Sequence, residues 1–555
     1  MRRLLLLSGL AVILGFAGGG GAWVLLHLIK LMSEHRPGGV GLIVVAVGGA
    51  IVISLLALWA PVIRGHGIPE AMEAVLTRQS RISPRAALAK PLSAAIAIGT
   101  GAPFGAEGPI IVTGGSIGSL LGQFLPVSPS ERKILLASGA AAGMAATFGT
   151  PLAAVVLVIE LLLFEFSTRA FVPLVVASSI AAGMHSAFYG AGPLFKVPLH
   201  DYAGLAGFPA FVVLGLGAGL LAVVVARGLF TVEDWYRRLP IGEFWHPVIG
   251  AVGFAVIGLA VPRVLGVGYD VIGDLLTNRL AAGTVAVLVA AKLVAWWVAL
   301  GSGTSGGTLA PILLISAGYG SLFGAGMHAL FPSVSAGPFA LVAMAATFGA
   351  ATRASFAAMV FVFELTRDYQ VLLPLMLATV VADLVAAALL PESIMTEKLS
   401  RRGLRVRKDF EVDALRSTSV REMMTAPVET LADTATVAHA RRVLAAGRHG
   451  AYPVVDASGS CVGIVARGDL LRLDEHEDAD SPVLDHASRD VVSVAPDDLA
   501  VTVVEVMLTE GVDHVPVVDG RRLVGICTRT DILQARQAQL DHERRQPGWR
   551  LRRVS

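Results

Sequence analysis

A single carboxylate, Glu107, stands in a long apolar run of the sequence, among residues that commonly begin a helix. Gly105 and Ala106 precede it, and Gly108 and Pro109 follow it. A charged side chain at membrane depth is costly, so such a residue is a candidate for function. Glycine lets two backbones approach closely, and proline fits the first turn of a helix. We therefore predict a helix start at this motif, with free N–H groups and the positive end of the helix dipole beside the carboxylate.

Two further segments have the same character. They read Gly65-His66-Gly67-Ile68-Pro69 and Gly307-Thr308-Leu309-Ala310-Pro311. Several helix N-termini that converge would hold a small anion without a full positive charge and would still release it. A packing kink is the alternative interpretation of one such motif, but three motifs in register across a repeat favour an anion site.

The carboxylate of Glu107 would then bind where a permeant anion binds. Backbone amides favour its charged form and burial disfavours it. When it is deprotonated it blocks the site, and when it is protonated it swings away and an anion enters. A structural salt bridge is the alternative, but the nearby sequence offers no basic partner.

The elements that must position these motifs occur twice. The segment from Gly105 recurs from Gly307, a shift of 202 residues, and Met144–Gly149 recurs identically as Met344–Gly349. Two further blocks, beginning at Gly65 and Leu152, recur at shifts of 201 and 204 residues. The apolar part is therefore two related halves, about 1–200 and 205–398. Such repeats are typical of transporters, with the site at the interface of the halves. The repeat alone leaves open whether the halves are inverted or parallel.

Composition indicates a membrane protein: 54% of the 555 residues are hydrophobic and 15% are charged, and the net charge of +2 does not indicate a nucleic-acid partner. Glycine and proline break many apolar segments, so we expect more helical segments than simple crossings of a bilayer. Arg2 and Arg3 precede an apolar run to about Leu28. A signal peptide is one interpretation, but a first membrane helix with a cytoplasmic basic end fits the length of the run better.

Charge is dense after about residue 390, which predicts a soluble tail. The domains expected are a membrane part (1–398), a basic linker (399–416), two similar units (417–475 and 480–538) and a polar tail (539–555). Landmarks of the two units repeat at shifts of 63 and 62 residues, and each mixes short β-branched strands with alanine-rich helices. The linker is predicted to be a solvated face beside the membrane, on the cytoplasmic side. Cys461 and Cys527 both lie in the tail, as in a reduced cytosolic domain without disulfides.

Together the three Gly/Pro motifs and the helix end at Phe363-Glu364-Leu365-Thr366-Arg367-Asp368-Tyr369 resemble the CLC family of chloride channels and proton-coupled chloride exchangers over residues 38–398. The resemblance implies an all-α polytopic fold of about eighteen helical segments in an inverted repeat. It implies a homodimer with one anion pathway per subunit and cytoplasmic termini. Glu107 falls on the gating glutamate of the family. The amides around Ala106–Gly108 and Thr308–Ala310 fall on its anion-coordinating backbone.

The tail resembles a tandem pair of CBS domains, an α+β regulatory module. The ribose-binding pattern of that module is Ser/Thr-x-x-Asp after a Gly-Ile strand. Thr528 and Asp531 satisfy the pattern, whereas Asp469 keeps the acid and Ala466 replaces the hydroxyl. The resemblance therefore implies an adenine nucleotide in the second unit, with tails that only dimerise as the alternative.

Several positions depart from the CLC pattern. His66 stands where the family usually has an anion-coordinating serine; imidazole can donate a hydrogen bond or become cationic, or His66 can be a solvated loop residue. Met395 stands where a coordinating tyrosine is common, and a thioether donates nothing to an anion. Leu309 replaces an aromatic residue. Leu161 replaces the inner glutamate of proton-coupled members, and Glu160 before it matches Glu364 in the repeat, which favours an architectural role.

The sequence therefore predicts a multi-pass protein of the cell (inner) membrane that transports chloride or a similar small monovalent anion, gated by Glu107 in a voltage- or proton-dependent way, with no cofactor required. Strict chloride–proton antiport, and selectivity for nitrate or fluoride, remain open alternatives, and Leu161 favours weak coupling or none. A membrane sensor that transports nothing is a further class. No nucleophile–base pair, metal-ligand cluster or phosphate loop indicates an enzyme.

Overall fold

The computed structural model describes residues 2–164, 166–197, 207–331, 336–404, 415, 418–446, 449–473 and 479–545, with side chains to residue 537. The chain divides into two compact units, Met1–Phe410 and Glu411–Ser555. Most of the expected basic linker 399–416 and the end of the polar tail 539–555 lie outside the described residues.

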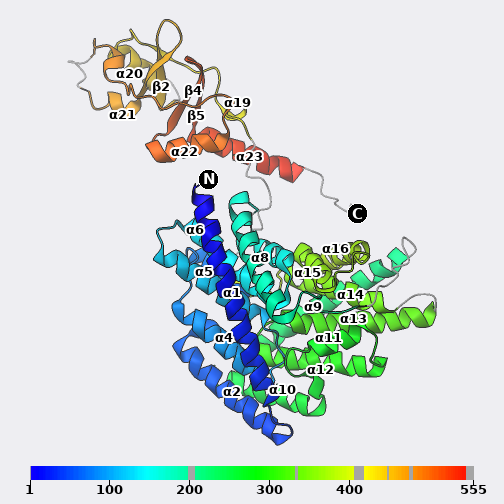
Figure 1. The fold of residues 1–555 in the computed structure, drawn as a ribbon. Helices are drawn as coiled ribbons and strands as arrows, with labels where there is room; N and C mark the ends of the chain where they lie inside the picture. The colour runs from blue at the N-terminus through cyan, green and yellow to red at the C-terminus, as the bar shows by residue number, and fades with distance from the viewer. Residues whose placement is uncertain are drawn as a thin grey trace. The chain divides into compact units, whose positions relative to one another are not determined.

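In the part of the chain that the structure describes, the first unit has two successive sets of eight helices, and Figure 1 shows how they are arranged. The first set is α1 (Arg2–Glu34), α2 (Val40–Trp59), α3 (Ile68–Thr77), α4 (Pro84–Gly99), α5 (Glu107–Phe124), α6 (Pro129–Phe148), α7 (Pro151–Val158) and α8 (Thr168–Tyr189). The second is α9 (Phe208–Arg238), α10 (His246–Ala260), α11 (Tyr269–Leu276), α12 (Ala282–Gly301), α13 (Leu309–Leu330), α14 (Gly337–Thr352), α15 (Ser355–Thr366) and α16 (Leu372–Leu389). The short α17 (Glu397–Arg401) follows. Each helix of the first set has its counterpart in the second, as the repeat predicts.

Length and composition let seven of the described helices cross a membrane: α1, α2, α8, α9, α12, α13 and α16. The other described helices are shorter or less apolar, which agrees with the expected excess of helical segments over crossings. A 3₁₀ turn precedes α3 and another precedes α11, at Pro61–Ile63 and Pro262–Val264, and a π turn (Ile159–Leu163) follows α7.

Glycine lets α5 and α6 pack with their backbones in contact. A β-carbon added at Gly114 would lie 2.1 Å from the carbonyl oxygen of Gly139, and one added at Gly118 would lie 2.1 Å from that of Leu135. The hydrophobic effect does not drive helices together within a membrane, so close van der Waals packing between small residues holds them in contact instead. The pair α13 and α14 uses the same device, because a β-carbon at Gly320 would lie 2.3 Å from the carbonyl oxygen of Phe339.

Contacts between the two halves are reciprocal. The amide of Gly65 donates to Gly303 (3.2 Å), and the matching amide of Gly266 donates to Gly101 (3.3 Å). Gly105 and Gly307 form an antiparallel bridge directly before α5 and α13, so these two helices begin at one place and run away from each other. Figure 1 shows them on opposite sides of the first unit. Helices that are equivalent in sequence and opposite in direction make an inverted repeat, which the sequence repeat alone left open.

The second unit is an α+β module with two similar parts. The first part contains α19 (Val420–Met423), β1 (Leu431–Ala432), α20 (Val437–Ala446), β2 (Ala451–Val455), β3 (Cys461–Ala466) and α21 (Arg467–Leu470). The second contains a 3₁₀ turn (Val483–Asp485), α22 (Ala500–Glu510), β4 (His514–Asp519), β5 (Arg522–Thr528) and α23 (Arg529–Arg545). Strand β2 pairs with β1 in parallel and with β3 in antiparallel fashion, and β4 pairs with β5 in antiparallel fashion. Both cysteines are free thiols.

Candidate functional site

Glu107 is the first residue of α5, directly after the N-cap Ala106, and its side chain is fully buried. The carboxylate folds back over two glycines. A β-carbon added at Gly105 would lie 1.7 Å from Oε2 of Glu107, and one added at Gly307 would lie 2.8 Å from the same atom. The two glycines of the antiparallel bridge therefore form a cradle for the carboxylate between the starts of α5 and α13.

Groups from both halves surround the carboxylate. The hydroxyl of Tyr269 donates a hydrogen bond to Oε1 at 2.9 Å, and the amides of Glu107 and Ala310 face the carboxylate. Oε2 is buried and has no hydrogen-bond partner among the described residues. A buried carboxylate oxygen without a partner is costly.

The first Gly/Pro motif lies against the same place. Gly67 caps α3 with φ of 89°, and Ile68 and Pro69 begin the helix. A β-carbon added at Gly108 would lie 2.3 Å from the carbonyl oxygen of His66. The start of α5 can therefore pack against this loop only because residue 108 is glycine. The amide of Gly306 donates to Gly65 at 3.4 Å, which ties this loop to the third motif. The structure thus brings all three motifs together, as the sequence predicts.

The His66 side chain lies in the interior rather than in a solvated loop, because only 1% of the residue is exposed. Neither ring nitrogen has a hydrogen-bond partner among the described residues. Buried polar groups are nearly always paired, so an unpaired imidazole beside this site is free to donate to a bound anion.

The third motif begins α13. Thr308 is its N-cap, Leu309 its first residue, and both are buried. The hydroxyl of Thr308 has no partner among the described residues, so it is a second buried donor that a ligand could use. Leu309, which stands where the sequence comparison expects an aromatic residue, packs its aliphatic side chain in the apolar core.

Met395 lies between α16 and α17 and is completely buried in the apolar core. Its amide donates to the Ser393 hydroxyl at 3.2 Å. Lys398, three residues further along, lies beside the first motif, because its Nζ would be 2.8 Å from a β-carbon added at Gly65. The same Nζ forms an ion pair with Glu233 at 3.2 Å.

Leu161 is buried in the π turn after α7 and offers no titratable group there. Glu160, beside it, accepts a hydrogen bond from the amide of Ala357 at 2.9 Å. Glu364 accepts in turn from the amides of Leu152 (3.1 Å) and Ala153 (2.7 Å). Each glutamate therefore caps a helix of the other half, which is the architectural role that the repeat predicts for Glu160.

Two buried lysines and one tyrosine belong to this region and did not emerge from the sequence. Nζ of Lys90 donates to the carbonyls of Ile63 and Gly65, both at 2.7 Å. Nζ of Lys292 donates to those of Val264 (3.0 Å) and Gly266 (2.7 Å). Both lysines are fully buried. They lie in apolar sequence at the repeat distance of 202 residues, and this spacing could have marked them as equivalent functional candidates. Tyr269 could have been found from the repeat, because it occupies the position that matches Ile68 of the first Gly/Pro motif.

The tail contains a cavity of about 350 Å³ between its two parts. Its described lining is Thr425, Pro427, Val428, Glu429, His449, Gly450, Ala451, His514, Ile526, Thr528, Thr530, Asp531 and Gln534. Asp531 accepts from the amide (2.7 Å) and hydroxyl (2.6 Å) of Thr528 and from the hydroxyl of Thr425 (2.8 Å). Burial is the main cause that lowers the pKa of the His514 imidazole below its usual value. Asp469 lies elsewhere, with its carboxylate on the amide of Ala466 at 2.9 Å.

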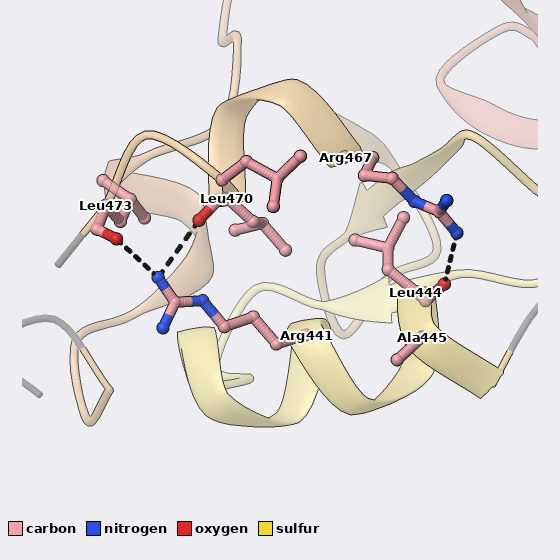
Figure 2. A pocket seen from close by; sticks show the side chains of 7 residues that line it. Arg441, Leu444, Ala445, Arg467, Leu470 and Leu473 are labelled. Atoms are coloured by element: carbon pink, nitrogen blue, oxygen red, sulfur yellow. Dashed lines mark hydrogen bonds between the residues drawn. The ribbon is translucent and has the colours of Figure 1, made fainter. Parts of the chain in front are cut away.

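A second hollow of about 670 Å³ lies in the first part of the tail, on α20 and α21 (Figure 2). Its two arginines are already engaged: Arg441 donates to the carbonyls of Leu470 (3.0 Å) and Leu473 (2.8 Å), and Arg467 donates to that of Leu444 (3.1 Å). The other residues that line this hollow are leucines and an alanine.

Comparison with known proteins adds to this geometry. A family model described as voltage gated chloride channel matches residues 48–387, and the CBS domain model matches residues 420–476 and 483–538. A Ralstonia nicotianae protein named as a ClcB-like chloride channel protein is 32% identical over 351 residues, or 62% of this chain and 81% of that protein. The H⁺/Cl⁻ exchange transporter ClcA of Vibrio campbellii is 29% identical over 357 residues, or 62% of this chain and 76% of that protein. The crystal structure of a slow cyanobacterial Cl⁻/H⁺ antiporter superimposes with a TM-score of 0.64 at 26% identity, covering 72% of this chain and 98% of that chain.

Proposed function

The chain belongs to the CLC family of chloride channels and exchangers and carries a tandem pair of CBS domains, and on this premise we propose that it moves chloride, or a similar small monovalent anion, along a pathway gated by Glu107. It is a multi-pass membrane protein of a transport family and not an enzyme. We place it in the cell membrane as a homodimer, with the CBS pair in the cytoplasm.

One observation carries the gate assignment: the carboxylate of Glu107 lies in the glycine cradle where α5 and α13 begin head to head. The starts of α3 and α11 reach the same place through His66 and Tyr269. Helix N-termini present unpaired N–H groups, so the position suits an anion of any origin. A carboxylate attached to the chain and a free chloride ion compete for it.

Protonation decides that competition. The charged carboxylate stays among the amides and excludes an anion, whereas the neutral carboxyl loses most of its attraction and leaves. Acid therefore opens the pathway. The unpaired ring nitrogens of His66 and the hydroxyl of Thr308 then supply donors to the entering anion.

Proton coupling is expected to be weak. A proton that reaches Glu107 from the other side of the membrane needs an intermediate acceptor, and Leu161 removes the carboxylate that proton-coupled relatives place there. Glu160 does not replace it, since its carboxylate caps α15.

Glu107→Gln is expected to abolish the acid dependence of anion flux, because the amide keeps the shape of the side chain but carries no charge at any pH. Purified protein in liposomes would be assayed for chloride efflux across a pH series. Glu160→Gln, the same chemical change at a helix cap, is the control and should keep the wild-type pH profile. An unchanged profile in Glu107→Gln would refute the gate.

The cavity of the CBS pair supports a second proposal, that an adenine nucleotide binds to the tail. Thr528 and Asp531 both line the cavity and are held together by two hydrogen bonds. A carboxylate fixed in this way can accept hydrogen bonds from the two hydroxyls of a ribose.

Asp531→Ala is expected to weaken adenosine monophosphate or triphosphate binding about tenfold, the loss expected for a charge-assisted hydrogen bond. Calorimetry on the fragment 415–540, a compact unit with apolar cores of its own, would measure it. Asp469→Ala, at the equivalent position outside the cavity, should bind like the unmutated fragment. If the unmutated fragment binds no nucleotide, the proposal is wrong.

A further inference from the structure

We propose that Tyr269 is a latch that holds Glu107 in its blocking position, an inference that rests on the proposed gating role of Glu107. The hydroxyl of Tyr269 donates to Oε1 of Glu107 at 2.9 Å, and the two residues come from opposite halves of the repeat. A hydrogen bond to an ionised acceptor is stronger than one to a neutral acceptor, so the bond favours the charged, blocking form over the protonated one.

The hydroxyl is aimed by the structure around it. Tyr269 is the first residue of α11 and follows Gly268, the N-cap, at φ of 84°. The ring packs edge-on against Phe148, with centroids 6.2 Å apart, and against Phe195, with centroids 6.3 Å apart. The ring is thereby fixed while the carboxylate, at the end of a flexible side chain, can leave. Tyr269 is therefore a positioning residue.

The latch occurs only once in the repeat. The position that matches Tyr269 in the first half is Ile68, which has no hydroxyl, and the position that matches Glu107 in the second half is Leu309. The halves thus differ at two places that their inverted arrangement brings together, one contributing the carboxylate and the other the donor. A residue needed only to pack the start of α11 could have been isoleucine, as in the first half.

Other charged groups near Glu107 come from several elements. Lys292 on α12 interacts electrostatically with Glu107. His66 lies before α3, Lys90 lies on α4 and contacts the same loop, and Arg36 approaches Gly101 before α5. Helix α6, packed along α5, has its charged residues in its first turn, at the opposite end from Glu107. Of these side chains, Tyr269 is the one that donates a hydrogen bond to the carboxylate. Removing its hydroxyl therefore changes the gate without changing any charge.

Tyr269→Phe removes the hydroxyl and keeps the ring. Chloride efflux from liposomes would be measured over a pH series. The midpoint of acid activation should move upward by about one pH unit, and flux above the wild-type midpoint should rise about tenfold, as expected for the loss of one charge-assisted hydrogen bond. In the Glu107→Gln background the same substitution should have no effect, because no charged gate remains to be latched.

Tyr319→Phe is the matched control, since the Tyr319 hydroxyl donates to the carbonyl of Leu214 at 3.2 Å on α9. It should leave the pH profile unchanged. A wild-type profile in Tyr269→Phe, or an equal effect in the Glu107→Gln background, would overturn the latch while leaving the gate in place. If the wild-type protein moves no anion at any pH, the proposed function itself is wrong, so the two failures are distinguishable.

Discussion

Gly105→Ala is expected to give a folded protein whose anion flux no longer needs acid. The three atoms nearest to an added β-carbon all belong to the Glu107 carboxylate, the closest at 1.7 Å. No backbone atom opposes the methyl group as closely, and the end of a flexible side chain can move where backbone cannot. The gate should therefore be displaced while the helices keep their places. Flux at neutral pH should rise about tenfold or more, to the level that the wild type reaches in acid, which corresponds to at least about 1.4 kcal/mol of lost preference for the blocked state.

Two glycines provide the controls for this experiment. Gly307→Ala should instead disrupt the site, because its β-carbon would lie 2.4 Å from the carbonyl oxygen of Gly105, a backbone atom of the bridge. Gly9→Ala on α1 has nothing within 4 Å of the added carbon and should behave as wild type. A wild-type pH profile in folded Gly105→Ala protein would contradict the position assigned to the carboxylate.

Lys292→Met is expected to cause a large loss of stability. The ammonium of Lys292 is completely buried and donates to two carbonyls of the turn before α11. Methionine fills similar space but leaves both carbonyls without a donor, and an unsatisfied buried polar group costs about 1–3 kcal/mol. The loss should therefore be about 2–6 kcal/mol, and the turn that positions Tyr269 should loosen. The midpoint of thermal unfolding, followed by size-exclusion chromatography of detergent-solubilised protein, would measure it.

The repeat supplies a second test of the same kind. Lys90→Met should behave like Lys292→Met, because Lys90 makes the equivalent pair of bonds in the first half. Lys30→Met, on α1 with a side chain that is 72% exposed, should leave the midpoint unchanged. An unchanged midpoint in both buried-lysine variants would show that these bonds contribute little to the fold.

The fold was largely predictable because its information is spread over many residues. Four blocks at shifts of 200 to 204 residues predict two related halves, and the described residues form eight helices in each of these parts of the chain. Direction was not contained in the repeat, since inverted and parallel halves have the same sequence pattern. It emerges from one contact, the antiparallel bridge between Gly105 and Gly307.

The site was predictable where a motif marks a backbone feature, and less so where a single side chain acts across the halves. Glycine and proline in the sequence predict the starts of α3, α5 and α13, and the structure brings these starts together. Tyr269 lies 162 residues from Glu107, and a tyrosine in an apolar run looks like an ordinary membrane residue. Lys90 and Lys292 bind carbonyls that only the folded turns expose, so their partners could not be read from spacing.

Anion efflux from liposomes that contain the wild-type protein tests the central claim most directly. A chloride electrode and a pH electrode in one cuvette would record both ions, with a potassium ionophore to clamp the membrane potential. We expect chloride to leave, faster as the pH falls, with little or no proton movement in the opposite direction. Tight proton countertransport would show that Leu161 does not prevent coupling. Absence of chloride efflux from folded protein at every pH would contradict the proposal that this chain transports chloride through a pathway gated by Glu107.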